Sequence, residues 1–459
     1  MQPMSDQLSV RYIDLFSGMG GFRDGFERAA RKMNIEPICV FTSEIKTSAI
    51  KFYSDNFEQI EFEDITQKKE SEIPNFDILL AGFPCQAFSS AGKREGFLDT
   101  RGTLFFDIER ILKFHKPDGF ILENVEGLVN HDKQNKENEI GRTLEIILKS
   151  LRKLNYEVTW KVLDSSEFGL AQQRKRIFIV GTRSNKVSLN NFERKKVPLK
   201  NILEKDLPLE KSKTIDLLLK HYSLRDLPGK SLKDKRGGTN NIHSWDIELK
   251  GKTTQAQKEL LNELLKARRN KKWGDVKNIV WMDGMPLTLK EIKTFYTHPK
   301  LKILLDDLVK KGYVSYEHPK DLVTEKNGTS RKALRKERLD LPKGYNIVAG
   351  KLSFEISKIL DPNGITPTLV ATDLDRMMVS ERRGLRRLSI KEMLRLFGFN
   401  DTLHVNLTRN EIVDLLGNSV PVNIVESVSE RLLSIILKKN NYHNFIDTEI
   451  KVVQEVLFA

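Results

Sequence analysis

The 459-residue sequence contains little cysteine and no long apolar run, and each absence excludes a class of protein. Cys39 and Cys85 are the only cysteines, so the sequence does not encode a disulfide framework, and we expect a reducing, cytoplasmic setting. No apolar stretch is long enough to span a bilayer, and the first residues do not read as a signal peptide. We therefore expect no membrane partner. We also expect no metal site.

Positive charge is concentrated in the middle of the chain. The formal net charge is +14, and residues 191–350 contain 36 Lys+Arg against 21 Asp+Glu, while the rest of the chain is nearly neutral. Phosphate backbones attract such a segment whatever the base sequence, which favours a nucleic-acid partner. The alternative is a solvated, lysine-rich surface without a partner.

Short apolar runs recur along the first part of the chain, at Tyr12–Phe16, Ile38–Phe41, Asp77–Phe83, Gly119–Leu122 and Ile177–Val180. Between them lie helical patterns, for example at Leu104–Phe114 and Thr143–Leu154. This alternation predicts an α/β fold, in which a doubly wound, mostly parallel sheet is covered by helices on both faces.

After Gly181 the alternation fades and a lysine-rich region begins. Leu287–Tyr296 and Leu301–Gly312 have helical patterns, and Tyr313–His318 reads as a strand. This order fits a small winged-helix unit, but a generic helical insertion fits equally well. Two basic runs, Lys266–Trp273 and Arg331–Arg338, are weak evidence because solvated surfaces often have this composition.

The end of the chain is helical again. Leu388–Phe399 is predicted to be a helix that starts with a capping box between Ser389 and Glu392. A final amphipathic helix is expected from about Pro421 to Lys438.

A glycine-rich turn, Asp14–Phe22, directly follows the first predicted strand and opens a helix. Glycines in such a turn let the backbone approach a ligand, and the helix start offers free N–H groups. Glu44 follows the second strand, where a carboxylate can hold ribose hydroxyls, and Asp64 with Ile65 follows the next segment, where a carboxylate can accept from an adenine amino group. Each carboxylate alone could equally be an ordinary surface residue.

Cys85 lies at the carboxyl end of an apolar strand, within the sequence GFPCQAFS, where open α/β sheets place their sites. The polar segment that follows suggests a mobile loop, and its basic residues would favour the thiolate form needed for nucleophilic attack. A buried, inert thiol is the usual alternative, and we expect it for Cys39, which lies inside a strand.

Three charged residues mark two further strand ends. Glu123, in ENV, ends the strand at Phe120–Leu122 and could exchange a proton opposite Cys85. Arg174 and Arg176 alternate along a strand, so their guanidinium groups face the same way and could orient a carboxylate, a phosphate or a carbonyl oxygen. Taken singly, such residues are more often structural than catalytic.

The motifs DLFSGMGGF, GFPCQAFS, ENVEGL, QQRKRIF, RRLSIKEMLRLFGF and GNSVPVNIV, in this order, resemble those of the cytosine-5 DNA methyltransferase family of prokaryotic restriction-modification systems. The resemblance covers residues 10–183 and 366–437 and omits the middle of the chain. It implies an α/β fold of the S-adenosylmethionine-dependent methyltransferase type.

The resemblance also implies a role for each matching residue. Cys85 would add to carbon 6 of cytosine, Glu123 would act at ring nitrogen 3, and Arg176, supported by Arg174, would contact the base carbonyl. S-adenosylmethionine would be bound by Phe16, Gly18, Gly20, Gly21, Glu44, Asp64, Ile65, Pro84 and Asn418. A lid that binds DNA from the minor-groove side would include Gln86, Ser89, Ser90 and Lys93. One departure is Ile45, which stands where the family often has an aromatic residue, so adenine stacking would rest more on Phe16.

The resemblance predicts the domain organisation as well. Residues 10–183 would form the catalytic domain, completed by the helix at 417–438; residues 184–365 would be a smaller target-recognition region; and 366–416 would return the chain. The expected partners are double-stranded DNA and a companion restriction endonuclease. The target base would be flipped out of the DNA duplex. The enzyme itself is expected to be a monomer. A transfer-RNA cytosine methyltransferase and a non-catalytic DNA-binding regulator on the same scaffold are the alternatives.

Overall fold

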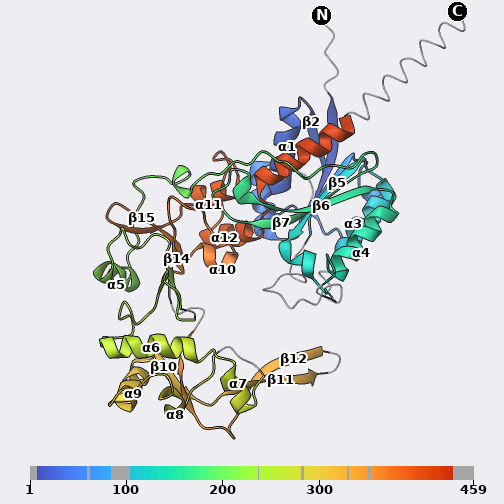
Figure 1. Ribbon diagram of the computed structural model, residues 1–459. Helices are drawn as coiled ribbons and strands as arrows, with labels where there is room; N and C mark the ends of the chain where they lie inside the picture. The colour runs from blue at the N-terminus through green and yellow to red at the C-terminus, as the bar shows by residue number, and fades with distance from the viewer. Residues whose placement is uncertain are drawn as a thin grey trace, which may run out of the picture. The chain divides into compact units, whose positions relative to one another are not determined.

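The computed structural model divides into two compact units, each described here by itself (Figure 1). It describes residues 8–58, 62–83, 104–133, 135, 137–235, 237–280, 284–327, 330–349 and 354–437. The first unit takes in the chain up to Glu204, Pro362–Asp375 and the chain from Ser389 onward, and the second takes in Lys205–Asp361 and Arg376–Leu388. The second unit is thus shorter than the predicted 184–365 and also includes part of the predicted return segment.

A seven-stranded sheet forms the centre of the first unit, in the order β3-β2-β1-β4-β5-β7-β6. Its strands are β1 (Ser9–Leu15), β2 (Glu36–Ser43), β3 (Phe62–Glu63), β4 (Ile78–Gly82), β5 (Gly119–Val125), β6 (Glu157–Asp164) and β7 (Lys175–Thr182). The pairs among β1 to β5 are parallel, and β7 is antiparallel to both β5 and β6. The predicted mostly parallel α/β sheet is therefore confirmed.

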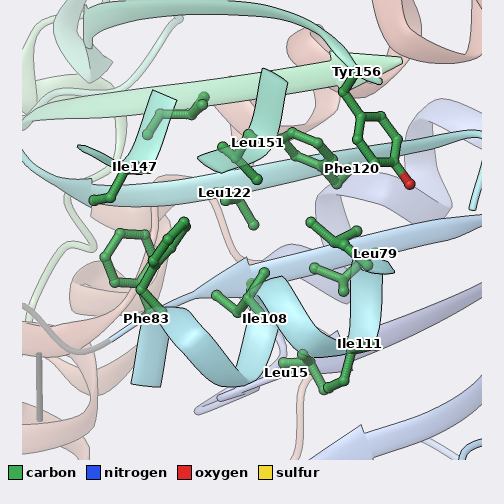
Figure 2. Packing of buried hydrophobic residues seen from close by; sticks show 14 of the residues in the cluster. Leu15, Leu79, Phe83, Ile108, Ile111, Phe120, Leu122, Ile147, Leu151 and Tyr156 are labelled. Atoms are coloured by element: carbon green, nitrogen blue, oxygen red, sulfur yellow. The ribbon is translucent and has the colours of Figure 1, made fainter. Parts of the chain in front are cut away.

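Helices cover both faces of this sheet. One face packs against α3 (Leu104–His115) and α4 (Arg142–Lys153), as Figure 2 shows for Ile108, Ile111, Ile147 and Leu151 against strand residues such as Leu79, Phe120 and Leu122. The other face packs against α1 (Gly21–Lys32) and a helix at 422–437. α2 (Thr47–Asn56), α10 (Ala371–Leu374), α11 (Ile390–Phe397) and α12 (Arg409–Asn418) complete this unit within the described residues.

The helix at 422–437 closes the first unit by lying against α1. Val425, Val428 and Leu432 are completely buried. A Cβ on Gly25 would stand 2.7 Å from the Val422 carbonyl oxygen, so glycine is required for this close contact. The sequence prediction of a final amphipathic helix is confirmed, as is the capping box in which Ser389 and Glu392 start α11.

The described residues of the second unit form two hydrophobic clusters. One includes α5 (Lys213–His221) and a five-stranded sheet in the order β16-β15-β14-β8-β9, with bounds β8 (Ser231–Leu232), β9 (Asn241–Ile242), β14 (Lys358–Ile359), β15 (Met377–Glu381) and β16 (Gly384–Arg387). The other includes α6 (Gln255–Ala267), α7 (Lys272–Lys277), α8 (Leu289–Ile292), α9 (Leu301–Lys311), β10 (Val314–Glu317) and β13 (Gly344–Ile347). A hairpin of β11 (Lys320–Asn327) and β12 (Ser330–Glu337) joins β10 to β13.

The helix predicted at Leu287–Tyr296 is wrong in extent, because α8 covers only Leu289–Ile292. Leu287 instead pairs with Tyr345 of β13, and Thr288 forms a capping box with Glu291 that starts the helix. The predictions at Leu301–Gly312 and Tyr313–His318 correspond to α9 and β10. Among the described residues, no helix combines the length and the apolar character needed to cross a membrane.

Candidate active site and cofactor pocket

The glycine-rich turn joins β1 to α1 at the point where the strand order of the sheet reverses, since β2 lies on one side of β1 and β4 on the other. Open α/β sheets bind ligands at this position. Phe16, Gly18 and Gly20 all have positive φ angles, of 57°, 54° and 75°. A Cβ on Gly20 would lie 2.4 Å from the Phe57 ring, so both its conformation and its surroundings require glycine.

Glu44, just beyond β2, is fixed by backbone hydrogen bonds. One carboxylate oxygen accepts from the Gly18 N–H at 2.9 Å, and the other accepts from the N–H groups of Ile45 and Lys46, both at 2.8 Å. These bonds join the glycine-rich turn to the loop after β2. The oxygen that accepts only from Gly18 has a further lone pair available, so Glu44 can still accept from a ligand hydroxyl.

Asp64 and Ile65 follow β3. The exposed Asp64 accepts through Oδ1 from the backbone N–H of Thr66, at 3.0 Å, and from its hydroxyl, at 2.8 Å. The Ile65 side chain is buried, and its carbonyl oxygen accepts from the Arg110 guanidinium. The Asp64 carboxylate is therefore held on a fixed backbone.

Glu123 and Arg176 form an ion pair on the neighbouring strands β5 and β7, with Nε of Arg176 2.9 Å from Oε1 of Glu123. Burial raises the pKa of Glu123, and the positive charges of Arg176 and Arg174 oppose this shift. The Glu123 carboxyl lies beside Gly82, the last residue of β4, where a Cβ would be 3.5 Å from Oε2. Glu123 therefore lies next to the end of the strand that leads to Cys85.

Asn124 links the same strand end to β5. Its amide nitrogen donates to the Phe83 carbonyl at 3.2 Å, and its amide oxygen accepts from the Val125 N–H at 2.8 Å. Because the side chain is buried, these bonds are shielded from water. Asn124 thus fixes the backbone just before the PCQ motif, a role for the Asn of ENV that the sequence did not indicate.

Arg174 is buried and binds backbone carbonyl groups from the last part of the chain. Its guanidinium donates to the carbonyl oxygens of Leu369, Gly417 and Ser419 at 2.8 to 2.9 Å, and it lies over the Phe397 ring. The structure therefore distinguishes the two arginines: Arg176 pairs with Glu123, and Arg174 holds the segment that carries Asn418.

These residues line one cavity of about 500 Å³ in the first unit, a volume within the usual range of small-molecule sites. The residues predicted from the sequence that line it are Phe16, Gly18, Gly21, Glu44, Asp64, Ile65, Glu123, Arg174, Arg176 and Asn418. Gly20 does not line it and instead forms the N-cap of α1. Cys85, Pro84, Gln86, Ser89, Ser90 and Lys93 lie outside the described residues.

The cavity wall also includes residues that the sequence did not single out, among them Phe83, Leu415 and Val420. Val420 is the last residue of the GNSV motif, so the whole motif could have pointed to it, whereas Leu415 lies two residues before the motif. Lys46, another lining residue, forms an ion pair with Asp414 of α12. Ile45 lines the cavity with its side chain 73% exposed.

Asp14 is a buried acid beneath the glycine-rich turn, and the sequence had suggested no role for it. Complete burial raises its pKa from 3.8 to about 8, against the opposing effect of Arg23. A side-chain hydrogen bond with Tyr53 also opposes the shift, and burial outweighs both effects. We therefore predict that Asp14 is protonated in the folded protein at neutral pH.

This protonation makes stability depend on pH. Between pH 4 and 8 the folded state holds a proton that the unfolded state has released, so the free energy of unfolding falls by up to about 1.4 kcal/mol per pH unit as pH rises. An Asp14→Asn variant should lose this dependence, which melting curves at pH 5 and pH 8 would measure. Asp55→Asn, at an exposed site on α2, is the control. Equal pH dependence in wild type and Asp14→Asn would contradict the assignment.

A mixed seven-stranded sheet, with its cavity at the switch point and an acid after each of the second and third strands, defines an α/β enzyme of the S-adenosylmethionine-dependent methyltransferase class. The family profile "C-5 cytosine-specific DNA methylase" matches residues 10–434, and the chain belongs to this family. It is a DNA (cytosine-5-)-methyltransferase of the Type II restriction-modification kind, and S-adenosylmethionine is its methyl donor.

Individual relatives agree with this assignment. The chain is 56% identical to the Type II methyltransferase M.NlaIV of Neisseria lactamica over 425 residues, which cover 92% of this chain and 99% of the relative. It is 39% identical to the Type II methyltransferase M.BanI of Aneurinibacillus aneurinilyticus, over 93% of this chain and 96% of the relative. The solved Entamoeba histolytica methyltransferase EhMeth has the same fold, with a TM-score of 0.50, 18% identity, and coverage of 93% of this chain and 99% of that one.

Proposed function

We propose that this enzyme methylates carbon 5 of a cytosine flipped out of duplex DNA, through a covalent bond between Cys85 and carbon 6. The observation that carries the proposal is the single cavity that contains both the acidic residues of the cofactor side and the Glu123–Arg176 pair. The methyl donor and the target base could then bind in the same cavity. Since the base is stacked inside the duplex, it must leave the stack to reach this cavity.

Cys85 is the proposed nucleophile. It follows Phe83 by two residues, and covalent geometry allows two residues to span at most about 7 Å. The Phe83 carbonyl accepts a hydrogen bond from Asn124, the residue that follows Glu123 in β5. Addition of the thiolate to carbon 6 makes carbon 5 nucleophilic, and later loss of the carbon 5 proton and of the thiolate restores the ring.

Glu123 and Arg176 are proposed to act on the ring during this addition. The raised pKa of Glu123 favours a protonated carboxyl that can donate to ring nitrogen 3, which relieves the negative charge formed by thiolate attack. Arg176 holds Glu123 at 2.9 Å and can donate other N–H groups to the carbonyl oxygen of the base. Arg174 is proposed to act by holding the segment that carries Asn418, so it is a positioning residue.

S-adenosylmethionine supplies an electrophilic methyl group, and the residues of the cavity fit it. Glu44 is proposed to accept from the ribose hydroxyls and Asp64 from the adenine amino group, with Phe16, Gly18 and Ile65 around them. Asn418 and Pro84 would complete the pocket. Gln86, Ser89, Ser90 and Lys93 would form the lid that closes on DNA and excludes water.

Glu44→Ala and Asp64→Ala variants should each bind S-adenosylmethionine about 10- to 100-fold more weakly, because each loses hydrogen bonds to a charged group. Calorimetric titration would measure this. Glu36→Ala removes an exposed carboxylate from the opposite end of β2 and should leave the affinity unchanged. Wild-type affinity in both pocket variants would show that the cofactor lies elsewhere.

The second unit is proposed to recognise the target sequence. Within its bounds the sequence has 39 Lys+Arg and 22 Asp+Glu, whereas the rest of the chain has 38 and 41. This excess of positive charge would bind phosphates and make affinity for DNA dependent on salt. The named relatives are Type II methyltransferases, which supports a companion restriction endonuclease for this enzyme. A monomeric enzyme acting in the cytoplasm remains our expectation.

The direct test of this function is incorporation of labelled methyl groups from S-adenosylmethionine into unmethylated duplex DNA. We expect label in 5-methylcytosine at one recurring sequence. Transfer RNA serves as the competing substrate. Label in transfer RNA and not in DNA would overturn the proposal, as would label spread over cytosines without a common sequence.

A further inference from the structure

One hydrophobic cluster of the second unit has the connectivity of a winged helix. The order is α6, the short helix α7, a β-bridge at Leu287, α8, α9, β10, the β11–β12 hairpin and β13, so that α7 is an addition to the winged-helix order. Leu287 and Tyr345 exchange two backbone hydrogen bonds, at 3.0 and 2.7 Å, and β10 pairs with β13 in antiparallel register. The sheet order is thus Leu287, β13, β10, and the hairpin lies between the last two strands in sequence, as a wing does.

We propose that residues 255–348 form a winged-helix unit that reads the DNA target, with α9 entering the major groove and the β11–β12 hairpin contacting the backbone beside it. This inference rests on the proposed recognition role of the second unit and specifies which elements perform it. It chooses the winged-helix alternative over the generic insertion that the sequence left open.

A shared core makes these elements one body. Buried residues from the helices meet buried residues from the strands in a single cluster, to which α6 contributes Leu260 and Leu264, α8 Ile292, α9 Leu301, Leu305 and Leu308, and the strands Val314, Tyr345 and Ile347. A second link joins α9 to α6, because Gln257 donates to Asp307 at 2.7 Å. The outer face of α9 is therefore presented on a rigid support.

The outer face of α9 has side chains suited to base edges near its N-terminal end. In helix-turn-helix proteins, the N-terminal residues of the second helix contact the bases. Lys302 has a side chain 68% exposed and Ile303 is 65% exposed. A lysine can donate to guanine O6 and N7, and an apolar side chain can contact the thymine methyl group. Asp306, which accepts from the Tyr345 hydroxyl at 2.9 Å and pairs with Lys302, fixes the position of that lysine.

The hairpin is suited to phosphates. Residues 320–338 contain seven Lys+Arg and three Asp+Glu. Arg335 and Lys336 are exposed. Eight residue pairs hold the two strands together, and Figure 1 shows them extending away from the α6 to α9 helices. A two-stranded ribbon of this kind can lie along a DNA groove.

A chain of polar contacts joins the base of the hairpin to α6. Arg268, the C-cap of α6, donates to Asn346 of β13 at 2.8 Å, and Asn346 donates to Glu317 of β10 at 2.8 Å. Lys320, the first residue of β11, lies 3.4 Å from Glu317. This chain of contacts joins the hairpin to α6 and β13, which share a hydrophobic core with α9.

The test compares three variants of the full-length enzyme. The helix variant is Lys302→Ala with Ile303→Ala, and the wing variant is Arg335→Ala with Lys336→Ala. Lys266→Ala is the matched control, because Lys266 is 70% exposed on α6 and pairs with Glu263 at 2.8 Å, much as Lys302 pairs with Asp306 at 2.6 Å. All four substituted positions of the first two variants are exposed, and circular dichroism would verify that each variant folds.

Each variant is incubated with S-adenosylmethionine and unmethylated genomic DNA, and the methylated cytosines are mapped by sequencing. The quantity compared is the methylation rate at sites that differ from the wild-type consensus at one position, divided by the rate at consensus sites. This ratio should be at least about tenfold higher for the helix variant than for wild type. The wing variant should keep the consensus, bind all duplexes more weakly and lower the slope of log affinity against log salt by about 2. The control should match wild type in both measurements.

An unchanged consensus in the helix variant, or an unchanged salt slope in the wing variant, would overturn the inference. Failure of the proposed function looks different, because wild type itself would then leave DNA unmethylated. The salt slope is measured from DNA binding and not from methylation. It therefore tests the role of the hairpin even if wild type does not methylate DNA.

Discussion

A Cys85→Ser variant is expected to lose methyl transfer to DNA by more than about 10³-fold, because the hydroxyl is a far weaker nucleophile than the thiolate at neutral pH. Without attack at carbon 6, carbon 5 of cytosine has no means of accepting the methyl group. Single-turnover incorporation of labelled methyl groups into DNA would measure the loss. Affinity for S-adenosylmethionine should be nearly unchanged, which separates loss of chemistry from loss of folding.

Cys39→Ser is the matched control, since it makes the same atomic change at the other cysteine. Cys39 lies in β2, half-buried, with its thiol 3.6 Å from the Thr42 hydroxyl, and burial raises its pKa. A thiol held in this neutral form is a poor nucleophile, so this variant should keep most of its activity. Comparable loss in the two variants would contradict the assignment of Cys85.

A Glu123→Gln variant is expected to lose about 10²- to 10⁴-fold in the rate of methyl transfer, the usual range for a general acid. The amide keeps the size of the side chain but cannot transfer a proton to ring nitrogen 3, and it breaks the ion pair with Arg176. Single-turnover rates at saturating DNA would measure this loss. Binding of S-adenosylmethionine should be retained, because the proposed cofactor residues Glu44 and Asp64 are unchanged.

Glu126→Gln is the control for Glu123. Glu126 lies three residues further along, and its side chain is 52% exposed and 3.8 Å from Lys175. An exposed pair of this kind contributes little, so the variant should behave as wild type. A fully active Glu123→Gln enzyme would remove the carboxyl group from the mechanism and leave Arg176 as the main contact to the base.

The sequence predicts the sheet well where strands are buried on both faces. Tyr12–Phe16, Asp77–Phe83 and Ile177–Val180 are mainly apolar runs, and they correspond to β1, β4 and β7. The sequence missed β6, Glu157–Asp164, because this edge strand is only partly buried and mixes polar with apolar residues. It also missed β3, whose two residues give no periodic signal.

For the candidate site, the sequence predicts where some side chains lie but not which groups they contact. The positions of Glu44 and Glu123 follow from the predicted strand ends, because parallel strands bring those ends to one edge, whereas the strand before Asp64 was not predicted. Arg174 was assigned beside Arg176 by alternation, but alternation does not say which acceptors a long side chain reaches. Its carbonyl partners lie about 200 residues or more away in the chain, in segments that only the fold brings near.

The central claim, a covalent bond between Cys85 and the target base, is tested most directly with duplex DNA that contains 5-fluorocytosine in the methylated sequence. Fluorine on carbon 5 blocks the proton loss that would release the enzyme, so the intermediate should accumulate when S-adenosylmethionine is present. We predict a protein–DNA adduct that survives denaturation, whose digestion and mass spectrometry place the modified base on Cys85, and which the Cys85→Ser variant does not form. An adduct on any other residue, or an enzyme that methylates ordinary duplex DNA but forms no adduct with the fluorinated one, would contradict the mechanism.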